Sequence, residues 1–422
     1  MIKRGPLHFS FTNAFNFLML FYTLLACRNL YVDTMKEMTD IGLISEFLVN
    51  YQGGFVRRGL LGEILYQISL LFSLDSTTIL YIINFISIAC FLGVVIFFVY
   101  QFLKKRYNWW ILPLGFFLAN GWIIRKDYLM VLMLVAIIYG YIHLKRIYPK
   151  LFFVILMEAV LILTHEAFFF FGTPFIILLF LRDKNLNLKR EVRSLFSALL
   201  IFLFLIVCYF KGNAETVSNI SNSWSPLFPE DLVQDGGTIK SLGWETLSTF
   251  KFHFRVNFVT LNYGFIGLLV RPMALFFIYY LASRILFVFR TPRSELQNND
   301  KTLLSSILVF QFIMLIPMFT VLSCDTGRVV LYWLSSSYIF FLLIPREVLG
   351  SIFPQWFLRS VNIVNEKIDT LLLPTKGFMA LLILFVTITP VFFFIDVAMR
   401  RSVFGVVGTF VSDILRSIMI IF

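Results

Sequence analysis

Long apolar runs follow one another along the whole chain and are separated by short polar connections. Most runs approach the roughly 20 residues that an α-helix needs to cross the hydrocarbon core of a bilayer. The expected spans are residues 11–31, 78–101, 108–124, 127–144, 151–166, 167–181, 194–210, 272–289, 302–323, 328–345 and 377–397. A last segment, 403–422, either spans the membrane or lies in its interface. The pattern predicts an all-α, polytopic integral membrane protein with about 11–12 transmembrane helices.

Polar positions accumulate in two longer segments, residues 32–77 and 211–271. Within the first segment, apolar residues share one helical face: Leu60, Leu61, Ile64, Leu65 and Ile68. This spacing predicts an amphipathic helix that lies in the membrane interface after the first span. The second segment contains tryptophans, prolines and a Gly-Gly pair, and we expect it to form an ordered cap. No internal repeat or soluble domain is visible, so residues 1–422 are expected to form a single membrane domain.

The composition excludes a soluble protein. Hydrophobic residues make up 59% of the 422 positions and charged residues only 14%, and phenylalanine alone occupies 52 positions. A soluble chain carries about a quarter charged residues, which cover its surface in water. The four cysteines are far apart and form no C-x-x-C pair, so neither a zinc site nor a disulfide framework is expected. No motif calls for a bound cofactor.

The net charge of +12 comes from short basic clusters between the spans rather than from one surface. The clusters stand in alternating connections, at 104–106, 145–146, 182–190, 290–301 and 346–376. This alternation is typical of the positive-inside rule and argues against nucleic acid as a partner. With the N-terminus inside, the outer face receives the two long polar segments and the turns near residues 125, 165 and 325. We expect the functional residues on that face.

An arginine pair stands just before the predicted interfacial helix. Gly53 and Gly54 allow the backbone to bend and to approach a ligand closely. Arg57 and Arg58 then precede a helix N-terminus, where guanidinium forks and free backbone amides together suit a phosphate or pyrophosphate. The simpler alternative is that both arginines contact lipid head groups.

A histidine and a carboxylate, His165 and Glu166, end a strongly apolar run. Ionisable residues at membrane depth are costly, and their presence indicates function by default. An imidazole beside a carboxylate can supply a general base near neutral pH. The alternative is a structural histidine that forms a hydrogen bond between helices.

Three further outer positions carry charge between apolar runs. Asp325 and Arg328 are three residues apart, so they form either a closed ion pair or an anion site in which Asp325 orients the arginine. Arg125, Lys126 and Asp127 occupy a tight turn with the same two interpretations. Arg271 ends the long outer segment and is a candidate contact for an anionic lipid.

The layout resembles the O-antigen and capsule polymerases called Wzy, which are Phe-rich chains of about a dozen spans with one long outer loop and outward-facing arginines. It also resembles the GT-C glycosyltransferases, in which a catalytic carboxylate in the first outer loop precedes an interfacial helix. Asp33 or Asp40 followed by residues 59–72 matches that second pattern. The paired acidic motif of many GT-C members is missing here, so the choice of base among Asp33, Asp40, His165 and Glu166 stays open.

Both resemblances imply sugar transfer from polyprenyl-(pyro)phosphate-linked substrates at the outer face of the bacterial inner membrane, next to membrane lipids and other polysaccharide-assembly proteins. A repeat-unit polymerase is the leading expectation, and a GT-C monosaccharide transferase is the alternative within this class. A secondary transporter or lipid-linked-glycan flippase is the alternative from another class. Such carriers often contain internal repeats, and none is visible here.

Overall fold

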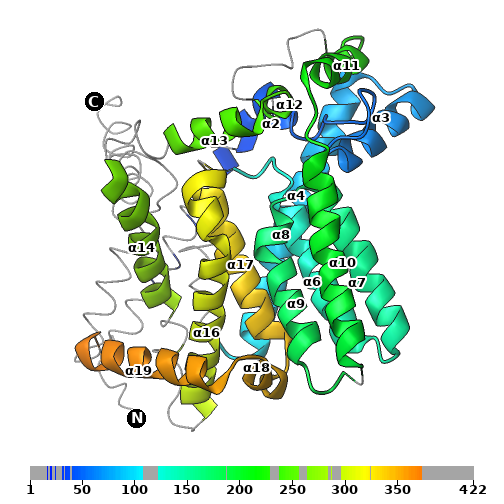
Figure 1. Ribbon diagram of the computed structural model, residues 1–422. Helices are drawn as coiled ribbons and strands as arrows, with labels where there is room; N and C mark the ends of the chain where they lie inside the picture. Colours follow the sequence, from blue (N-terminus) through cyan, green and yellow to red (C-terminus); the bar gives the residue numbers. More distant parts are fainter. Residues whose placement is uncertain are drawn as a thin grey trace, which may run out of the picture.

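The computed structural model describes residues 40–107, 122–228, 237–255, 264–283 and 296–372, apart from Asn187 and Cys324, together with Phe287 and a few positions before Asp40. Within these ranges all regular secondary structure is helical (Figure 1). The expected spans 11–31, 108–124 and 377–397 and the segment 403–422 lie wholly or mostly outside the described residues.

Five described helical segments are long and apolar enough to cross a membrane. They are α4 (Ser76–Lys104), α7 (Ile147–Thr164), α10 (Arg190–Tyr209), the Asn299–Leu322 segment formed by α16 (Leu296–Pro317) and the π-turn η3 (Met318–Leu322), and α17 (Thr326–Leu343). Further apolar helices stand among them: α6 (Asp127–His143), α9 (Thr173–Arg182) and α14 (Gly264–Ser283). The sequence prediction of an all-helical protein with several membrane-suited helices is therefore confirmed.

The two neighbouring spans expected at 151–166 and 167–181 differ from the structure at their junction. Helix α7 ends at Thr164, and the chain then turns before a short helix, α8 (Phe168–Phe171), precedes α9. Pro174 stands in the first turn of α9 and has no amide hydrogen, so it suits the start of a helix rather than its interior. His165 and Glu166 consequently lie in a turn and not on a continuous helix.

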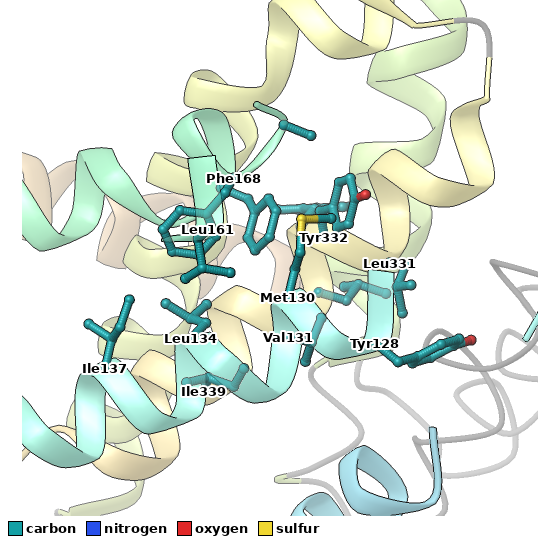
Figure 2. Packing of buried hydrophobic residues seen from close by; sticks show 14 of the residues in the cluster. Tyr128, Met130, Val131, Leu134, Ile137, Leu161, Phe168, Leu331, Tyr332 and Ile339 are labelled. Atoms are coloured by element: carbon teal, nitrogen blue, oxygen red, sulfur yellow. The ribbon is translucent and has the colours of Figure 1, made fainter. Parts of the chain in front are cut away.

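The core centres on α17, which packs against α16 and α6. In the apolar 18-residue stretch of α17 that could cross a membrane, 89% of the residues are buried, compared with 22% in the corresponding stretch of α10. Figure 2 shows Tyr332 and Leu331 of α17 among apolar side chains of α6, α7 and α8. The ring of Tyr332 stacks on Phe171 with centroids 4.4 Å apart. Helix α10 instead exposes apolar side chains such as Phe202 and Leu205, as a helix that faces lipid must.

Short helices gather at one end of the bundle, which we call the capped end (Figure 1). They are α2 (Ile41–Ile44), α3 (Leu60–Phe72), α11 (Ala214–Trp224), α12 (Thr238–Leu242) and α13 (Thr246–Arg255). The Trp224 indole of α11 donates a hydrogen bond to the Leu48 carbonyl at 2.8 Å and ties the two long polar segments together. Helices α18 (Arg346–Ile352) and α19 (Gln355–Leu372) lie at the opposite end.

Helix α3 confirms the helix that the sequence predicts after residue 59, although its apolar residues divide between two surfaces. Leu65 is buried, and Tyr66 packs edge-on against Trp224 with ring centroids 5.2 Å apart. Ile64 and Leu71 are exposed instead. One surface of α3 therefore packs on the protein, and an outer apolar surface stays uncovered. Its place in the membrane interface remains a prediction.

Candidate functional site

Charged side chains from five separate segments meet at the capped end, and we call this group the charged cluster. Its members are mostly buried and pair across the fold: Glu46, Arg57, Arg58, Arg125, Lys126, Asp127, His165, Glu166, Asp325 and Arg328. Five of these residues are basic and four are acidic, and the tenth is the histidine. The structure thus brings together most of the outer residues that the sequence singles out.

Arg58 and Glu166 form the most direct contact between two predicted site residues. The Arg58 Nε lies 2.7 Å and 3.0 Å from the two Glu166 carboxylate oxygens, and its Nη2 lies 2.5 Å from Oε1. Arg57 adds a second guanidinium, with Nη1 3.3 Å from the same Oε1. The arginine side chains are 20% exposed and that of Glu166 is 10% exposed, so solvent reaches this edge of the cluster.

The backbone at Arg58 adopts an unusual conformation that positions this contact. Its φ is 68°, in the left-handed region that non-glycine residues rarely occupy, at a cost of about 1–3 kcal/mol. The Lys126 ammonium donates a hydrogen bond to the Arg58 carbonyl at 3.1 Å, and the Arg57 amide donates to the Phe210 carbonyl at 2.8 Å. These two bonds hold the loop in place, so that the Arg58 guanidinium is directed at Glu166.

The glycine pair allows this loop to pack closely against the backbone of α11. Gly54 has φ +100°, and a Cβ at Gly53 would lie 2.7 Å from the Thr216 carbonyl oxygen of α11. Any larger residue at Gly53 would push the loop away from α11. The partner of this close approach in the structure is therefore α11, whereas the sequence suggested a ligand.

Arg328 joins two carboxylates that lie far from it in the sequence. Its Nη2 lies 2.8 Å from both Glu46 oxygens, and its Nε lies 2.8 Å from Asp127 Oδ2. The Tyr332 hydroxyl donates to the other oxygen of Asp127. Asp325 instead caps α17 by accepting from the Arg328 amide, and its carboxylate pairs with Arg125 at 2.5 Å. Asp325 and Arg328 are thus two links in a larger network and not a closed side-chain pair.

Arg125 and Lys126, adjacent in sequence, have different surroundings. The Arg125 guanidinium lies between Asp325 and the Trp122 ring, 4.1 Å from the ring centroid. Lys126 is fully buried, and its ammonium has the Arg58 carbonyl as its single hydrogen-bond acceptor among the described residues. Burial lowers the pKa of Lys126 to about 8, against an opposing contribution from Glu46.

His165 is a neutral imidazole in this environment. Burial is the main cause that lowers its pKa well below the usual value, and the positive charges of Arg58 and Arg328 contribute. The Ala167 amide donates to Nδ1 at 3.1 Å, so the ring hydrogen is on Nε2, 3.5 Å from Glu46 Oε1. In this tautomer His165 presents a donor to the cluster and has no free nitrogen that could accept a proton.

Glu46 and Glu166, two carboxylates of the cluster, stay ionised. Burial alone would raise the pKa of Glu166, but Arg58 and Arg57 together outweigh it and hold this pKa well below the usual range. Glu46 behaves in the same way: burial is opposed by the positive charges of Arg328, Arg125 and Lys126, and the pKa of Glu46 is lowered. Glu166 is therefore a weak proton acceptor while it is paired with both arginines.

Three sequence candidates stand outside the cluster or outside the described residues. Asp40 is exposed, and its carboxylate caps α2 by accepting from the Gly42 amide at 2.9 Å and the Leu43 amide at 3.4 Å. Asp33 lies outside the described residues. Arg271 belongs to α14, and its side chain is not among those described.

Sequence reasoning missed Glu46 and Tyr332 as members of this network. Glu46 is a lone acid in the apolar run of residues 43–49, and this contrast was a readable signal. The sequence named Lys126 together with Arg125 and Asp127 in one turn but gave it no separate role. Tyr332 lies inside a span, and no local feature marks it.

A second, smaller ionic group lies at the opposite end. Asp300 accepts from the Tyr107 hydroxyl at 2.6 Å and pairs with Arg346 at 2.8 Å, and Lys105 lies near both charges. The Asp300–Arg346 pair joins α16 to α18. The charged cluster differs from this group in that it brings together ten side chains from five segments of the chain.

Within the described ranges no three histidine, cysteine, aspartate or glutamate side chains are grouped as metal ligands. The chain matches no protein-family profile, no curated protein and no solved structure. The chemistry of the charged cluster therefore has to be argued from its own geometry.

Proposed function

We propose that the chain is a glycosyltransferase of the bacterial inner membrane, with about 11–12 spans, that acts at the extracytoplasmic face on polyprenyl-(pyro)phosphate-linked sugars. Its reaction is the polymerisation of O-antigen or capsule repeat units. The observation that carries this proposal is the position of Arg57 and Arg58 beside the end of a lipid-facing helix.

Helix α10 exposes apolar side chains along its length, and its last residue, Tyr209, is 81% exposed. The next residue, Phe210, accepts a hydrogen bond from the Arg57 amide. The arginine pair therefore lies where a lipid-facing helix ends, which is the depth of lipid phosphates. A polyprenyl chain in the bilayer would bring its phosphate to this depth, and guanidinium forks bind phosphate with two parallel hydrogen bonds.

The reaction requires a stabilised leaving group and a proton acceptor. The acceptor hydroxyl oxygen forms a bond to the anomeric carbon of the donor sugar, and the bond from that carbon to the phosphate oxygen breaks. The bonding electron pair leaves on the (pyro)phosphate, where Arg57 and Arg58 stabilise the developing charge. The hydroxyl proton goes to a carboxylate of the cluster, and Glu166 is the one nearest the arginine pair.

Deletion of the gene followed by glycan analysis tests the proposal. A polymerase deletion leaves surface glycans with one repeat unit, whereas loss of a monosaccharide transferase leaves truncated repeats. Complementation with Arg58→Ala should fail at matched protein abundance, and complementation with the exposed control Arg359→Ala on α19 should succeed. Unchanged glycans in the deletion strain would refute the proposed function.

A secondary transporter is the second candidate, and Glu158 is the observation in its favour. This glutamate is fully buried within α7, where Thr173 donates to Oε2 at 2.8 Å and Oε1 has no hydrogen-bond partner among the residues that the structure describes. Buried carboxyls of this kind bind protons or ions in transporters. Normal glycan assembly in a Glu158→Gln strain would separate this residue from the proposed transfer reaction.

A further inference from the structure

Glu166 occupies the face of Arg58 that a phosphate would bind, and it also contacts Nη1 of Arg57 at 3.3 Å. Its two oxygens meet the Nε and Nη2 atoms of Arg58 in the side-on geometry that guanidinium also uses for phosphate. We propose that the Glu166 carboxylate is an internal substitute for the donor phosphate, which displaces it from Arg57 and Arg58 and so frees it to accept a proton. This inference rests on the function proposed above.

The displacement requires a change in side-chain torsions alone. Backbone hydrogen bonds hold the turn after α7. The Phe168 amide donates to the His165 carbonyl and the Phe169 amide donates to the Glu166 carbonyl, both at 3.1 Å. The Glu166 side chain itself is 10% exposed and lies at the solvent-reached edge of the cluster. An incoming anion can therefore reach the arginines without unfolding the turn.

The charge balance of the cluster favours an added anion. Its five basic residues face four carboxylates, and the buried Lys126 ammonium forms no ion pair with a described carboxylate. A (pyro)phosphate carries more charge than a carboxylate and offers more acceptor oxygens to the same two guanidinium groups. The phosphate therefore competes for sites that Glu166 fills at rest.

Release changes the chemistry of Glu166. Burial raises the pKa of this carboxyl, and Arg58 and Arg57 lower it. Once the phosphate neutralises these arginines, burial remains while their contribution falls, so the pKa rises and the carboxylate becomes a stronger proton acceptor. Donor binding would thus switch on the base, and the unoccupied enzyme would hold it in an inactive pair.

Binding of inorganic pyrophosphate to the purified full chain tests the proposal without sugar transfer. Calorimetry on the protein in lipid nanodiscs would compare wild type with Glu166→Gln and Glu166→Asp. The Gln variant should bind about tenfold tighter or more, because a charged competitor of the guanidinium groups is gone. The Asp variant keeps the charge but shortens the reach, so its gain should be smaller.

Glu215 supplies the matched control, since it is exposed on α11 at the same end and its Gln variant changes the net charge equally. Glu215→Gln should bind pyrophosphate as wild type does, and adding Arg58→Ala to Glu166→Gln should abolish the gain. Equal or weaker binding by Glu166→Gln, an equal gain in Glu215→Gln, or no binding by any variant would each overturn the inference.

The outcomes separate this inference from the proposed function. A pyrophosphate gain in Glu166→Gln together with normal glycans in the deletion strain supports the anion switch and refutes the glycan role. Loss of polymer in Arg58→Ala without a gain in Glu166→Gln supports the glycan role and overturns the switch.

Discussion

The ammonium of Lys126 donates a hydrogen bond to the backbone carbonyl of Arg58, 3.1 Å away, from a fully buried position. Arg58 has a left-handed backbone that costs free energy for any side chain larger than glycine. The bond links the N-terminus of α6 to the loop before α3, two elements that are far apart in the sequence. It thereby holds the Arg58 guanidinium against Glu166.

Lys126 predicts a pH dependence of stability. Its folded-state pKa is lowered to about 8, chiefly by burial, whereas an unfolded lysine titrates at about 10.4. Between these values the unfolded chain binds more protons than the folded one, so the free energy of unfolding rises with pH across this window. Lys126→Met should lose this rise, as measured by thermal unfolding from pH 7 to pH 10.5.

Lys367→Met on the exposed side of α19 is the control for this experiment, because it removes a lysine that water already solvates. It should keep the wild-type pH dependence. The same rise in Lys126→Met as in wild type would show that another group causes it.

Arg58 should tolerate neither loss of charge nor loss of its forked geometry. Lysine keeps the charge but cannot form the side-on pair that Nε and Nη2 make with Glu166. We expect Arg58→Lys to lower the transfer rate about tenfold or more, since a charge-assisted hydrogen bond is worth about 1.5–3 kcal/mol. The measurement is polymer length and transfer rate at matched protein levels.

Arg58→Gly separates the side chain from the backbone in this test. Glycine adopts the left-handed conformation without strain, so this variant should be no less stable than Arg58→Ala while being equally inactive. Wild-type activity in Arg58→Lys would reduce the requirement to a positive charge and contradict the forked recognition.

Arg328 should be a major contributor to stability at the capped end. Replacing it with methionine leaves Glu46 and Asp127 without their guanidinium, and breaking a buried pair in this way costs about 3–5 kcal/mol. Adding Glu46→Gln should recover part of the lost free energy of unfolding, because it removes one of the two buried carboxylates left without a partner. Denaturant unfolding of the two single variants and the double variant gives the coupling energy. Fully additive losses would contradict a direct Glu46–Arg328 interaction.

The capped end and the α18–α19 end should lie on opposite sides of the membrane. In a chain without its native cysteines, Phe55→Cys and Glu215→Cys report the capped end, and Lys184→Cys and Arg359→Cys report the other. A membrane-impermeant maleimide added to intact cells should label the first two alone. Labelling of all four from one side would contradict a membrane-spanning bundle in this orientation.

The sequence by itself determined the class of the protein, several helices and the identity of many cluster members. The helix after residue 59 appears as α3, and Arg57, Arg58, Arg125, His165, Glu166, Asp325 and Arg328 were all recognisable as charges placed against an apolar background. These inferences succeed because helix length and helical periodicity are local properties, set by the bilayer thickness and by 3.6 residues per turn.

Tertiary structure alone decided which charges meet. Arg328 binds Glu46 across 282 residues and Arg58 binds Glu166 across 108, and no local pattern contains such pairings. In the folded chain Asp40 caps α2, whereas Lys126 and Glu46 are part of the charged cluster. The physical reason is that pairing between buried charges depends on how helices are placed beside one another, and this placement follows from side-chain packing over the whole bundle.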